Sequence, residues 1–358
     1  MNTKHFSHRD NEPILIAHRG NCNGPNHEQE NHPDYITQTL ERNFYVEIDV
    51  WKMGDKIFLG HDAPQYEIDL DFLRHPRVYA HAKNIDALYL LVENNINCFS
   101  HNIDEAVLTL KGEIWTYPGK QLTRNSICVM PEWHTTDWKT LSQLDIVGIC
   151  SDYVGQIKMA SIYKSINDKN IVVPQENLSG FCRAIWANST WTWHNDLYSD
   201  LAQLREYGIV YEDNTTSLGK LHWTLFQFQT FPVESHLFND INDTKIIQSI
   251  ITQPVVITFK GLAKSRNGLM MCGYSSDNIN GIRDELRLNI SNIVEPHPQD
   301  IYHSTIFRCT KPIPEGIIDG IIAKWENKEI CTMTTCGWEF GYGTWTQRQG
   351  EKIVVARW

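Results

Sequence analysis

The sequence ILIAHRGNCNG, residues 14–24, decides the fold of the first half of the chain, together with YVEIDVWKMGDKIFLGHDAP, residues 45–64. The run ILIA is short and apolar, which is typical of a buried strand. His18 and Arg19 follow this run directly, so they lie at the carboxyl end of the strand. A parallel barrel carries its chemistry at that end of its strands. The first stretch therefore predicts a strand that delivers an imidazole and a guanidinium to a functional edge.

Around these two stretches, the first half repeats short β-rich runs bounded by turn-forming residues such as KMGDK and YPGK. Helical patterns lie between some runs, at 34–42 and at 84–94, where Asn84 is a candidate N-cap. This rhythm favours a compact TIM-type (β/α) barrel with reduced helices, because about 150 residues are fewer than the about 250 of a full barrel. A three-layer open sheet is the alternative. The predicted strands are 14–18, 45–51, 56–60, 77–81, 97–101, 113–117, 126–130 and 145–151.

Two carboxylates share one face of the second strand. In YVEIDVW, the period-2 alternation of a strand sends Glu47 and Asp49 to one side and the intervening apolar residues to the other. Two carboxylates this close repel each other unless a cation lies between them, and a divalent metal ion meets that need. The next strand, KIFLGHD, again ends in a histidine, His61. His18 and His61 can then supply a general base and a general acid, beside a metal ion that offsets phosphoryl charge.

The order IAHRG, EN at residues 30–31, EIDV and HD resembles the glycerophosphodiester phosphodiesterase family, whose relatives include phosphatidylinositol-type phospholipases C. The resemblance covers residues 13–157 and implies a TIM-type barrel with a divalent metal ion, Mg²⁺ or Ca²⁺. The family's E-x-K motif aligns with HAK, so His81 stands where the family has a metal-binding glutamate. CSDYV resembles the closing strand motif and places Asp152 at the barrel mouth. The roles implied are metal ligation by Glu47, Asp49 and His81, acid–base catalysis by His18 and His61, and substrate binding by Arg19 and Lys83.

The pattern changes in the second half of the chain. Helical NDLYSDLAQLREYG and INGIRDELRLNI alternate there with strand-like LHWTLFQF, VVITFKGL and YHSTIFRCT. We therefore predict that residues 1–165 form the barrel, that residues 166–184 are a linker, and that residues 185–358 form a second domain.

Two H-x-T triplets, HWT at 222–224 and HST at 303–305, each stand in an apolar strand pattern. A strand places residues i and i+2 on the same face, so each histidine lies beside its threonine while the middle residue faces the other way. If the two strands are neighbours, two imidazoles and two hydroxyls meet in one cleft. One imidazole then takes a proton from the nucleophile, the other protonates the leaving oxygen, and the hydroxyls hold the phosphate. The triplet HTT at 134–136 has no strand around it and serves as a decoy.

These two triplets resemble the signature of the two-histidine (2H) phosphoesterases, and the resemblance covers roughly residues 185–358. It implies a two-lobed α+β fold without a cofactor. It also implies opening or transfer at 2′,3′-cyclic phosphates or at small 2′–5′ or 3′–5′ linked nucleotides. The catalytic residues that it implies are His222, Thr224, His303 and Thr305.

Composition limits the partners and the compartment. The formal net charge of −11 argues against broad adhesion to nucleic-acid backbones, so we expect no extended duplex as a partner. No apolar run approaches the roughly 18 to 20 residues of a membrane span, and the polar first residues lack the apolar core of a signal peptide. The nine cysteines are scattered and never form C-x-x-C, which indicates free thiols in a reducing cytosol. We expect a cytoplasmic protein without membrane contact and see no protein partner.

Because both halves point to phosphodiester bonds, we expect a bifunctional phosphoric diester hydrolase acting on a small phosphodiester, a nucleotide or an RNA terminus. Two alternatives stay open. In the first, one domain is catalytic and the other is a binding module; the barrel is then the domain that has lost activity, since His81 removes a negative charge from its metal site. In the second, the chain is a non-catalytic interaction protein.

Overall fold

A computed structural model describes residues 12–175, 181–212, 221–231, 241–290, 301–344 and 348–357. The chain divides into two compact units, Met1–Ser161 and Ile162–Trp358. The division falls inside helix α5, Val154–Lys169, and strand β11, Phe181–Trp193, begins within the stretch predicted as a linker. Among the residues described, no helix has the length and apolar character needed to span a membrane.

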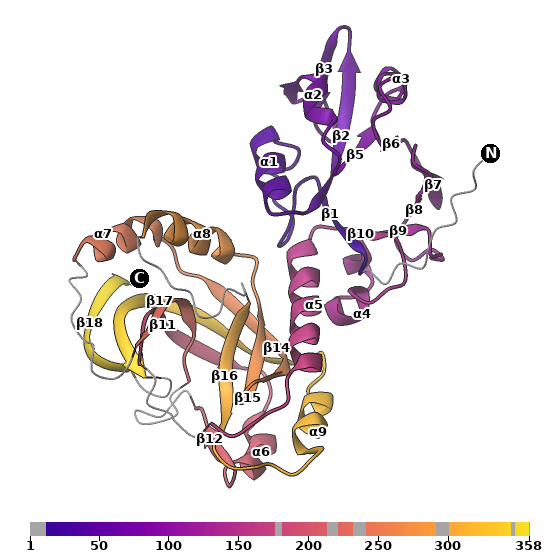
Figure 1. The fold of residues 1–358 in the computed structure, drawn as a ribbon. Coiled ribbons are helices and arrows are strands. Elements are labelled where there is room, and N and C mark those ends of the chain that lie inside the picture. The colour runs from indigo at the N-terminus through magenta and orange to yellow at the C-terminus, as the bar shows by residue number, and fades with distance from the viewer. Residues whose placement is uncertain are drawn as a thin grey trace. The chain divides into compact units, whose positions relative to one another are not determined.

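The first unit contains one curled sheet (Figure 1). Its strands are β1 Ile14–His18, β2 Tyr45–Met53, β3 Lys56–Leu59, β4 Tyr66–Ile68, β5 Val78–Ala82, β6 Cys98–Phe99, β7 Ala106–Leu108, β8 Ile114–Thr116, β9 Ser126–Val129 and β10 Gly148–Ser151. Parallel ladders run from β6 through β5, β2, β1, β10 and β9 to β8. The hairpin β3–β4 extends β2, and β7 pairs antiparallel with β8. All eight predicted strands are present, and β4 and β7 are additional.

The predicted closed TIM-type barrel is wrong. Within residues 12–161, β6 pairs with β5 and β7 pairs with β8, but no ladder joins the two ends of the sheet. The two ends are linked by a backbone hydrogen bond from Leu110 N to Cys98 O, 2.8 Å long. β6 has two residues and β7 has three, so they present few backbone groups, and β7 runs against the parallel direction that a TIM-type closure requires.

Helices cover the outer face of this curled sheet (Figure 1). They are α1 Pro33–Glu41, α2 Leu70–Leu73, α3 Ile85–Glu93 and α4 Trp138–Leu141. The side-chain oxygen of Asn84 accepts a hydrogen bond from Ala87 N at 3.0 Å, which confirms the predicted cap of α3. Val46, Ile48 and Val50 of β2 pack in one core with α1, α2 and α3. The opposite face of β2 is thereby left to Glu47 and Asp49.

The second unit also contains one curled sheet, and its ladders are all antiparallel. Besides β11, its strands are β12 Gly208–Val210, β13 Thr224–Phe231, β14 Val256–Ser265, β15 Gly268–Tyr274, β16 Tyr302–Cys309, β17 Glu329–Thr344 and β18 Arg348–Arg357. Their order is β12-β16-β15-β14-β17-β11-β13, and β18 pairs with β17. The predicted two-lobed arrangement is therefore wrong, because continuous backbone pairing runs through the whole sheet.

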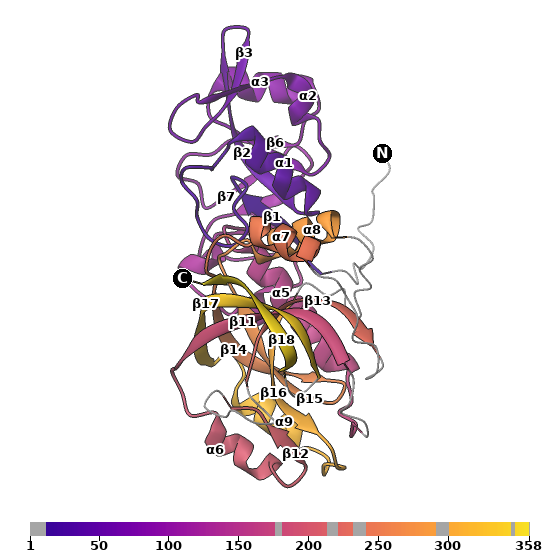
Figure 2. The ribbon, with the colours of Figure 1, turned by 90° about the vertical axis from the view of Figure 1, so that its left-hand side faces the viewer.

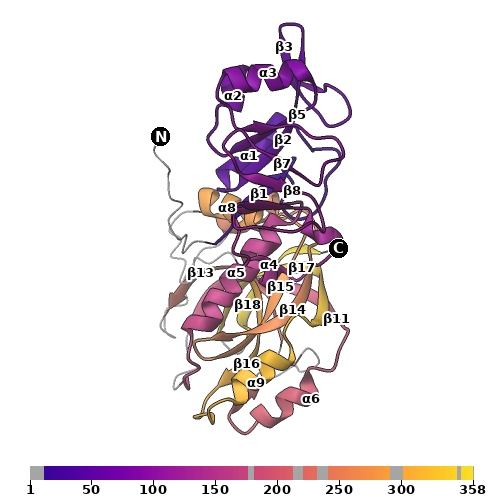
Figure 3. The same ribbon diagram turned by 90° about the vertical axis from the view of Figure 1, so that its right-hand side faces the viewer.

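Besides α5, four α-helices of the described part of this unit form two groups. They are α6 Tyr198–Leu201, α7 Ile241–Ile250, α8 Ile279–Asn289 and α9 Ile317–Lys324. Figure 2 shows α7 and α8 at one end of the sheet, with α6 and α9 at the other. Figure 3 shows the same separation of α8 from α6 and α9. α8 is in contact with β13, the strand that begins within the first H-x-T triplet.

Candidate functional site

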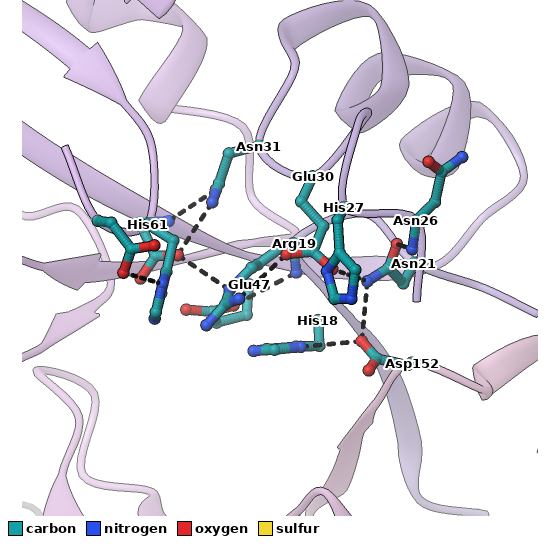
Figure 4. Close-up of polar contacts among 12 residues, drawn as sticks. His18, Arg19, Asn21, Asn26, His27, Glu30, Asn31, Glu47, His61 and Asp152 are labelled. Carbon is teal, nitrogen blue, oxygen red and sulfur yellow. Dashed lines mark hydrogen bonds and ion pairs between the residues drawn. The ribbon is translucent and has the colours of Figure 1, made fainter. Parts of the chain in front are cut away.

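His18 ends β1 and lies against Asp152, which follows β10 (Figure 4). The two residues are 134 positions apart, but β1 and β10 are adjacent parallel strands. His18 Nδ1 lies 2.9 Å from Asp152 Oδ1, and Asn21 Nδ2 donates a hydrogen bond of 2.9 Å to the same oxygen. Because Nδ1 faces Asp152, Nε2 is the nitrogen that remains for proton transfer.

The Asp152 carboxylate raises the pKa of the His18 imidazole. Burial by itself lowers the pKa of His18, but the hydrogen bond to Asp152 and the charge of Glu47 outweigh burial, so the pKa lies above its ordinary value. A folded-state pKa above the unfolded value contributes stability that is complete at low pH and lost as the pH rises through the folded pKa.

Replacing Asp152 with asparagine is expected to lower the pKa of His18, because an amide supplies no negative charge. Relative to the parent, the variant is then most strongly destabilised at acidic pH. An NMR titration of the His18 ring proton measures the shift. Asp62→Asn is the control, since it removes the partner of His61 instead. An unchanged His18 pKa in Asp152→Asn would refute the assignment of this pair.

The HR and EN motifs contact each other and the second strand. Arg19 has φ 52° and Asn31 has φ 62°, a left-handed conformation that costs a non-glycine residue about 1–2 kcal/mol. Arg19 Nη1 donates to Glu30 Oε2 at 3.0 Å, and Arg19 Nε forms an ion pair with Asp49 Oδ2 at 3.1 Å. Asn31 Nδ2 donates to Asp49 Oδ2, and Asn31 Oδ1 accepts from Asp49 N, both at 2.9 Å. These contacts hold two strained residues against one carboxylate, as is common at functional sites.

Glu47, Asp49 and His81 are close enough to share one ion. One possible ligand atom from each lies within 4.8 Å of the others. β2 and β5 are parallel neighbours whose register sets Asp49 beside His81, with His81 Nδ1 3.0 Å from Asp49 Oδ1. The carboxylates of Glu47 and Asp49 are buried, at 3% and 1% exposure. The structure therefore brings the three predicted metal ligands together.

The two carboxylates have opposite pKa shifts. Burial alone raises the pKa of Asp49, but the hydrogen bond with His81 and the charge of Arg19 reverse this and hold the pKa well below its usual range. Lys83 Nζ, 3.3 Å from Asp49 Oδ1, acts in the same direction. For Glu47, burial and the neighbouring Asp49 together raise the pKa. The cations of the site thus favour the charged form of Asp49, whereas burial and the neighbouring Asp49 disfavour the charged form of Glu47.

This donor set fits a divalent metal ion. The Glu47 carboxylate makes long contacts, with Oε2 3.4 Å from Arg19 N and Oε1 3.7 Å from His81 Nδ1. A buried carboxylate without short hydrogen bonds is unfavourable, and a cation would satisfy it. Carboxylates suit the predicted Mg²⁺ or Ca²⁺, whereas the imidazole of His81 moves the preference toward Mn²⁺ or Zn²⁺. The presence and identity of a metal ion stay predictions.

His61 follows β3 and lies near the same residues. Gly60 makes the preceding turn with φ 148°, and a Cβ there would lie 2.1 Å from a backbone oxygen. His61 Nδ1 lies 2.7 Å from Asp62 Oδ1, and the ring is more exposed than that of His18. Burial and then the charge of Arg19 lower the pKa of His61. Figure 4 shows both imidazoles beside Arg19 and Glu47.

His101 and Tyr117 are two residues of this region that the sequence analysis missed. The ring of His101 stacks on His81 at 4.6 Å and tilts against Tyr117 at 4.3 Å. Burial, with smaller effects of His81 and Lys83, lowers the pKa of His101 to about 4. Tyr117 Oη is buried without a hydrogen-bond partner in the described part of the chain. Their position at the carboxyl ends of the predicted strands 97–101 and 113–117 was the available signal.

The two H-x-T triplets lie at β13 and β16. His222 precedes β13, whose first residue is Thr224, while His303 and Thr305 lie within β16. The middle residues Trp223 and Ser304 are 0% and 1% exposed, and the histidines and threonines are more exposed. This confirms the predicted alternation.

The curl of the sheet brings these two triplets together. β13 is the last strand of the hydrogen-bonded order and β16 is the second, so they are not neighbours in the ladder. Nevertheless, Ser304 Oγ donates a hydrogen bond of 2.6 Å to the carbonyl oxygen of His222. This hydrogen bond joins the two triplets although no ladder pairs their strands, and the predicted meeting of the two imidazoles and two hydroxyls in one cleft stays a prediction.

No protein-family model and no curated protein matches this chain. Two solved structures are similar to about half of it. One is TT0787 of Thermus thermophilus, with a TM-score of 0.27 and 11% identity over 47% of this chain and 97% of that chain. The other is E. coli LigT in complex with NADP⁺, with a TM-score of 0.27 and 10% identity over 48% of this chain and 94% of that chain. A likeness with so low a TM-score carries no conclusion about the function of this chain.

Proposed function

We propose that this chain is a phosphodiesterase whose second unit carries a metal-independent two-histidine site. The hydrogen bond from Ser304 Oγ to the His222 carbonyl is the observation that supports it most, because it joins the backbone of the first H-x-T triplet to the middle residue of the second. Two imidazoles and two hydroxyls that met at one phosphodiester would suit general acid–base chemistry at an esterified phosphorus.

On a 2′,3′-cyclic phosphate, one imidazole takes a proton from water as the water oxygen bonds to phosphorus. The bond from phosphorus to one ribose oxygen breaks, and the second imidazole gives its proton to that oxygen. His222 and His303 have these two roles, and the hydroxyls of Thr224 and Thr305 donate hydrogen bonds to the non-bridging oxygens. The substrate class is a small cyclic or linear nucleotide diester or an RNA terminus.

The first unit supports a second, metal-dependent site, so the protein is bifunctional in this proposal. Glu47, Asp49 and His81 would hold a divalent ion, and the ion would offset phosphoryl charge. Arg19 and Lys83 bind the phosphoryl oxygens. His18, oriented by Asp152, and His61 exchange protons with the nucleophile and the leaving oxygen. In the alternative, this unit only binds a ligand. The argument for the alternative is that His81, standing where the family has a glutamate, supplies no negative charge to the metal site.

Chelation separates the two sites. Hydrolysis of a 2′,3′-cyclic nucleotide is expected to persist in EDTA, because no step at the two-histidine site needs a metal ion. Hydrolysis of a chromogenic linear phosphodiester by the first unit is expected to stop in EDTA and to return with added Mg²⁺, Ca²⁺ or Mn²⁺. Initial rates on both substrates, with and without chelator, give the measurement.

Each outcome decides one part of the proposal. If hydrolysis of the 2′,3′-cyclic nucleotide stops in EDTA, the two-histidine assignment is contradicted. Chelator-resistant activity alone, with no metal uptake by calorimetry, would make the first unit a binding module. Turnover of neither substrate would leave the non-catalytic alternative.

A further inference from the structure

The spacing of the two H-x-T triplets is not set by strand pairing. β13 pairs with β11, and β16 pairs with β12 and β15, so in the described sheet no ladder connects the two triplets directly. The backbone route between them runs through four other strands. Small changes of sheet curvature along this route would therefore move one triplet relative to the other, unless something else bridges them.

Two side chains make that bridge. Ser304, the middle residue of the second triplet, is buried and donates from Oγ to the carbonyl oxygen of His222 at 2.6 Å. Arg283 of α8 donates from Nε to Leu225 O at 2.8 Å and from Nη2 to Ile301 O at 3.1 Å. Leu225 follows the first triplet directly, and Ile301 lies two positions before the second.

Arg283 is well held for this task. It is 6% exposed, and its guanidinium lies over the ring of Tyr302 at 5.4 Å. Asn280 Oδ1 accepts from its Nη1 at 3.3 Å, one turn earlier on the same helix. The planar guanidinium presents several donors in fixed directions, so it can hold two carbonyl groups at one separation. A lysine has a single ammonium group and cannot reproduce this geometry.

We propose that Ser304 and Arg283 are positioning residues that fix the separation of His222 and His303. The inference rests on the proposed function of the second unit. The acid and the base must both reach one phosphodiester, and a displacement of about 1 Å at such a pair can cost about 100-fold in rate. The bridge acts on the backbone of the triplets, so neither positioning residue needs to touch the substrate.

Ser304→Ala tests the bridge with the smallest change. We expect kcat on a 2′,3′-cyclic nucleotide in EDTA to fall about 10- to 100-fold, while KM stays within about twofold, because ground-state binding is retained. Ser275→Ala is the matched control: Ser275 is also buried and donates from Oγ to Val256 O at 2.6 Å, a hydrogen bond that does not join the two triplets. Its kcat should equal that of the parent. Arg283→Lys should lower kcat in the same way as Ser304→Ala.

Hydrogen exchange provides a readout that does not depend on activity. Residues 221–226 and 301–306 should exchange faster in Ser304→Ala than in Ser275→Ala, at equal melting temperature. If the two segments exchange faster in Ser304→Ala but the parent does not hydrolyse the cyclic nucleotide, the proposed function is overturned and the bridge is supported. An active parent with an unchanged kcat in Ser304→Ala, or exchange equal to that of the control, would overturn the positioning role itself.

Discussion

Replacing His222 or His303 with alanine is expected to lower kcat on a 2′,3′-cyclic nucleotide by about 100- to 10,000-fold, the range for losing a general acid or base. Each imidazole moves one proton, so neither can replace the other. The double variant should be little worse than either single variant, because groups that act as a unit are not additive. The measurement is kcat in the presence of EDTA, which would silence the proposed metal-dependent site.

The chain offers a matched control for this result. His134 stands in the HTT triplet but follows a short 3₁₀ helix, Pro131–Trp133, and is not part of a strand. His134→Ala should therefore retain the parent rate. If His134→Ala lowers kcat as much as His222→Ala does, or if His303→Ala keeps the parent rate, the two-histidine site is not where we place it.

The second large effect concerns the carboxylates of the first unit, which should respond in opposite directions. Asp49→Asn leaves Arg19, Lys83 and His81 around a neutral amide and is expected to cost about 3–5 kcal/mol of stability, the range for breaking a buried ion pair. Glu47→Gln removes a buried carboxyl group whose charged form is disfavoured, at nearly constant volume. Without metal, it should be neutral or stabilising.

The pH dependence follows from the same shifts. The pKa of Asp49 is depressed in the folded state, so its stabilisation is complete above the unfolded pKa and is lost as the pH falls through the folded pKa. The pKa of Glu47 is raised, so the folded state binds a proton that the unfolded state has released. Stability therefore falls as the pH rises from the unfolded to the folded pKa of Glu47, and Glu47→Gln removes that fall.

Urea unfolding in EDTA, at neutral pH and at stepwise lower pH, measures both effects. Calorimetry with Mg²⁺, Ca²⁺ and Mn²⁺ supplies the functional half of the test. Each variant should lose metal binding, and at a pH below the folded pKa of Glu47 the parent should release a proton on binding, since Glu47 must be deprotonated to act as a ligand. Equal destabilisation by Glu47→Gln and Asp49→Asn would contradict the charge assignment.

Local sequence patterns determined the elements of this protein. Strand periodicity and turn residues predicted every strand of the first unit except β4 and β7, and Asn84 marked the start of α3 correctly. The E-x-D spacing placed Glu47 and Asp49 on one face, and the H-x-T spacing separated the motif side chains from the buried Trp223 and Ser304. Such features depend on the geometry of one strand or one helix end, which neighbouring residues specify.

Only the tertiary structure decided how the sheets close and what meets at the sites. β6 and β7 proved too short for a closed barrel, β7 also runs in the wrong direction, and the second unit proved to be one curled sheet instead of two lobes. The contact of His18 with Asp152 spans 134 positions, and that of Ser304 with His222 spans 82. Strand order, curvature and buried side chains from distant segments set these contacts together, and no local period in the sequence records them.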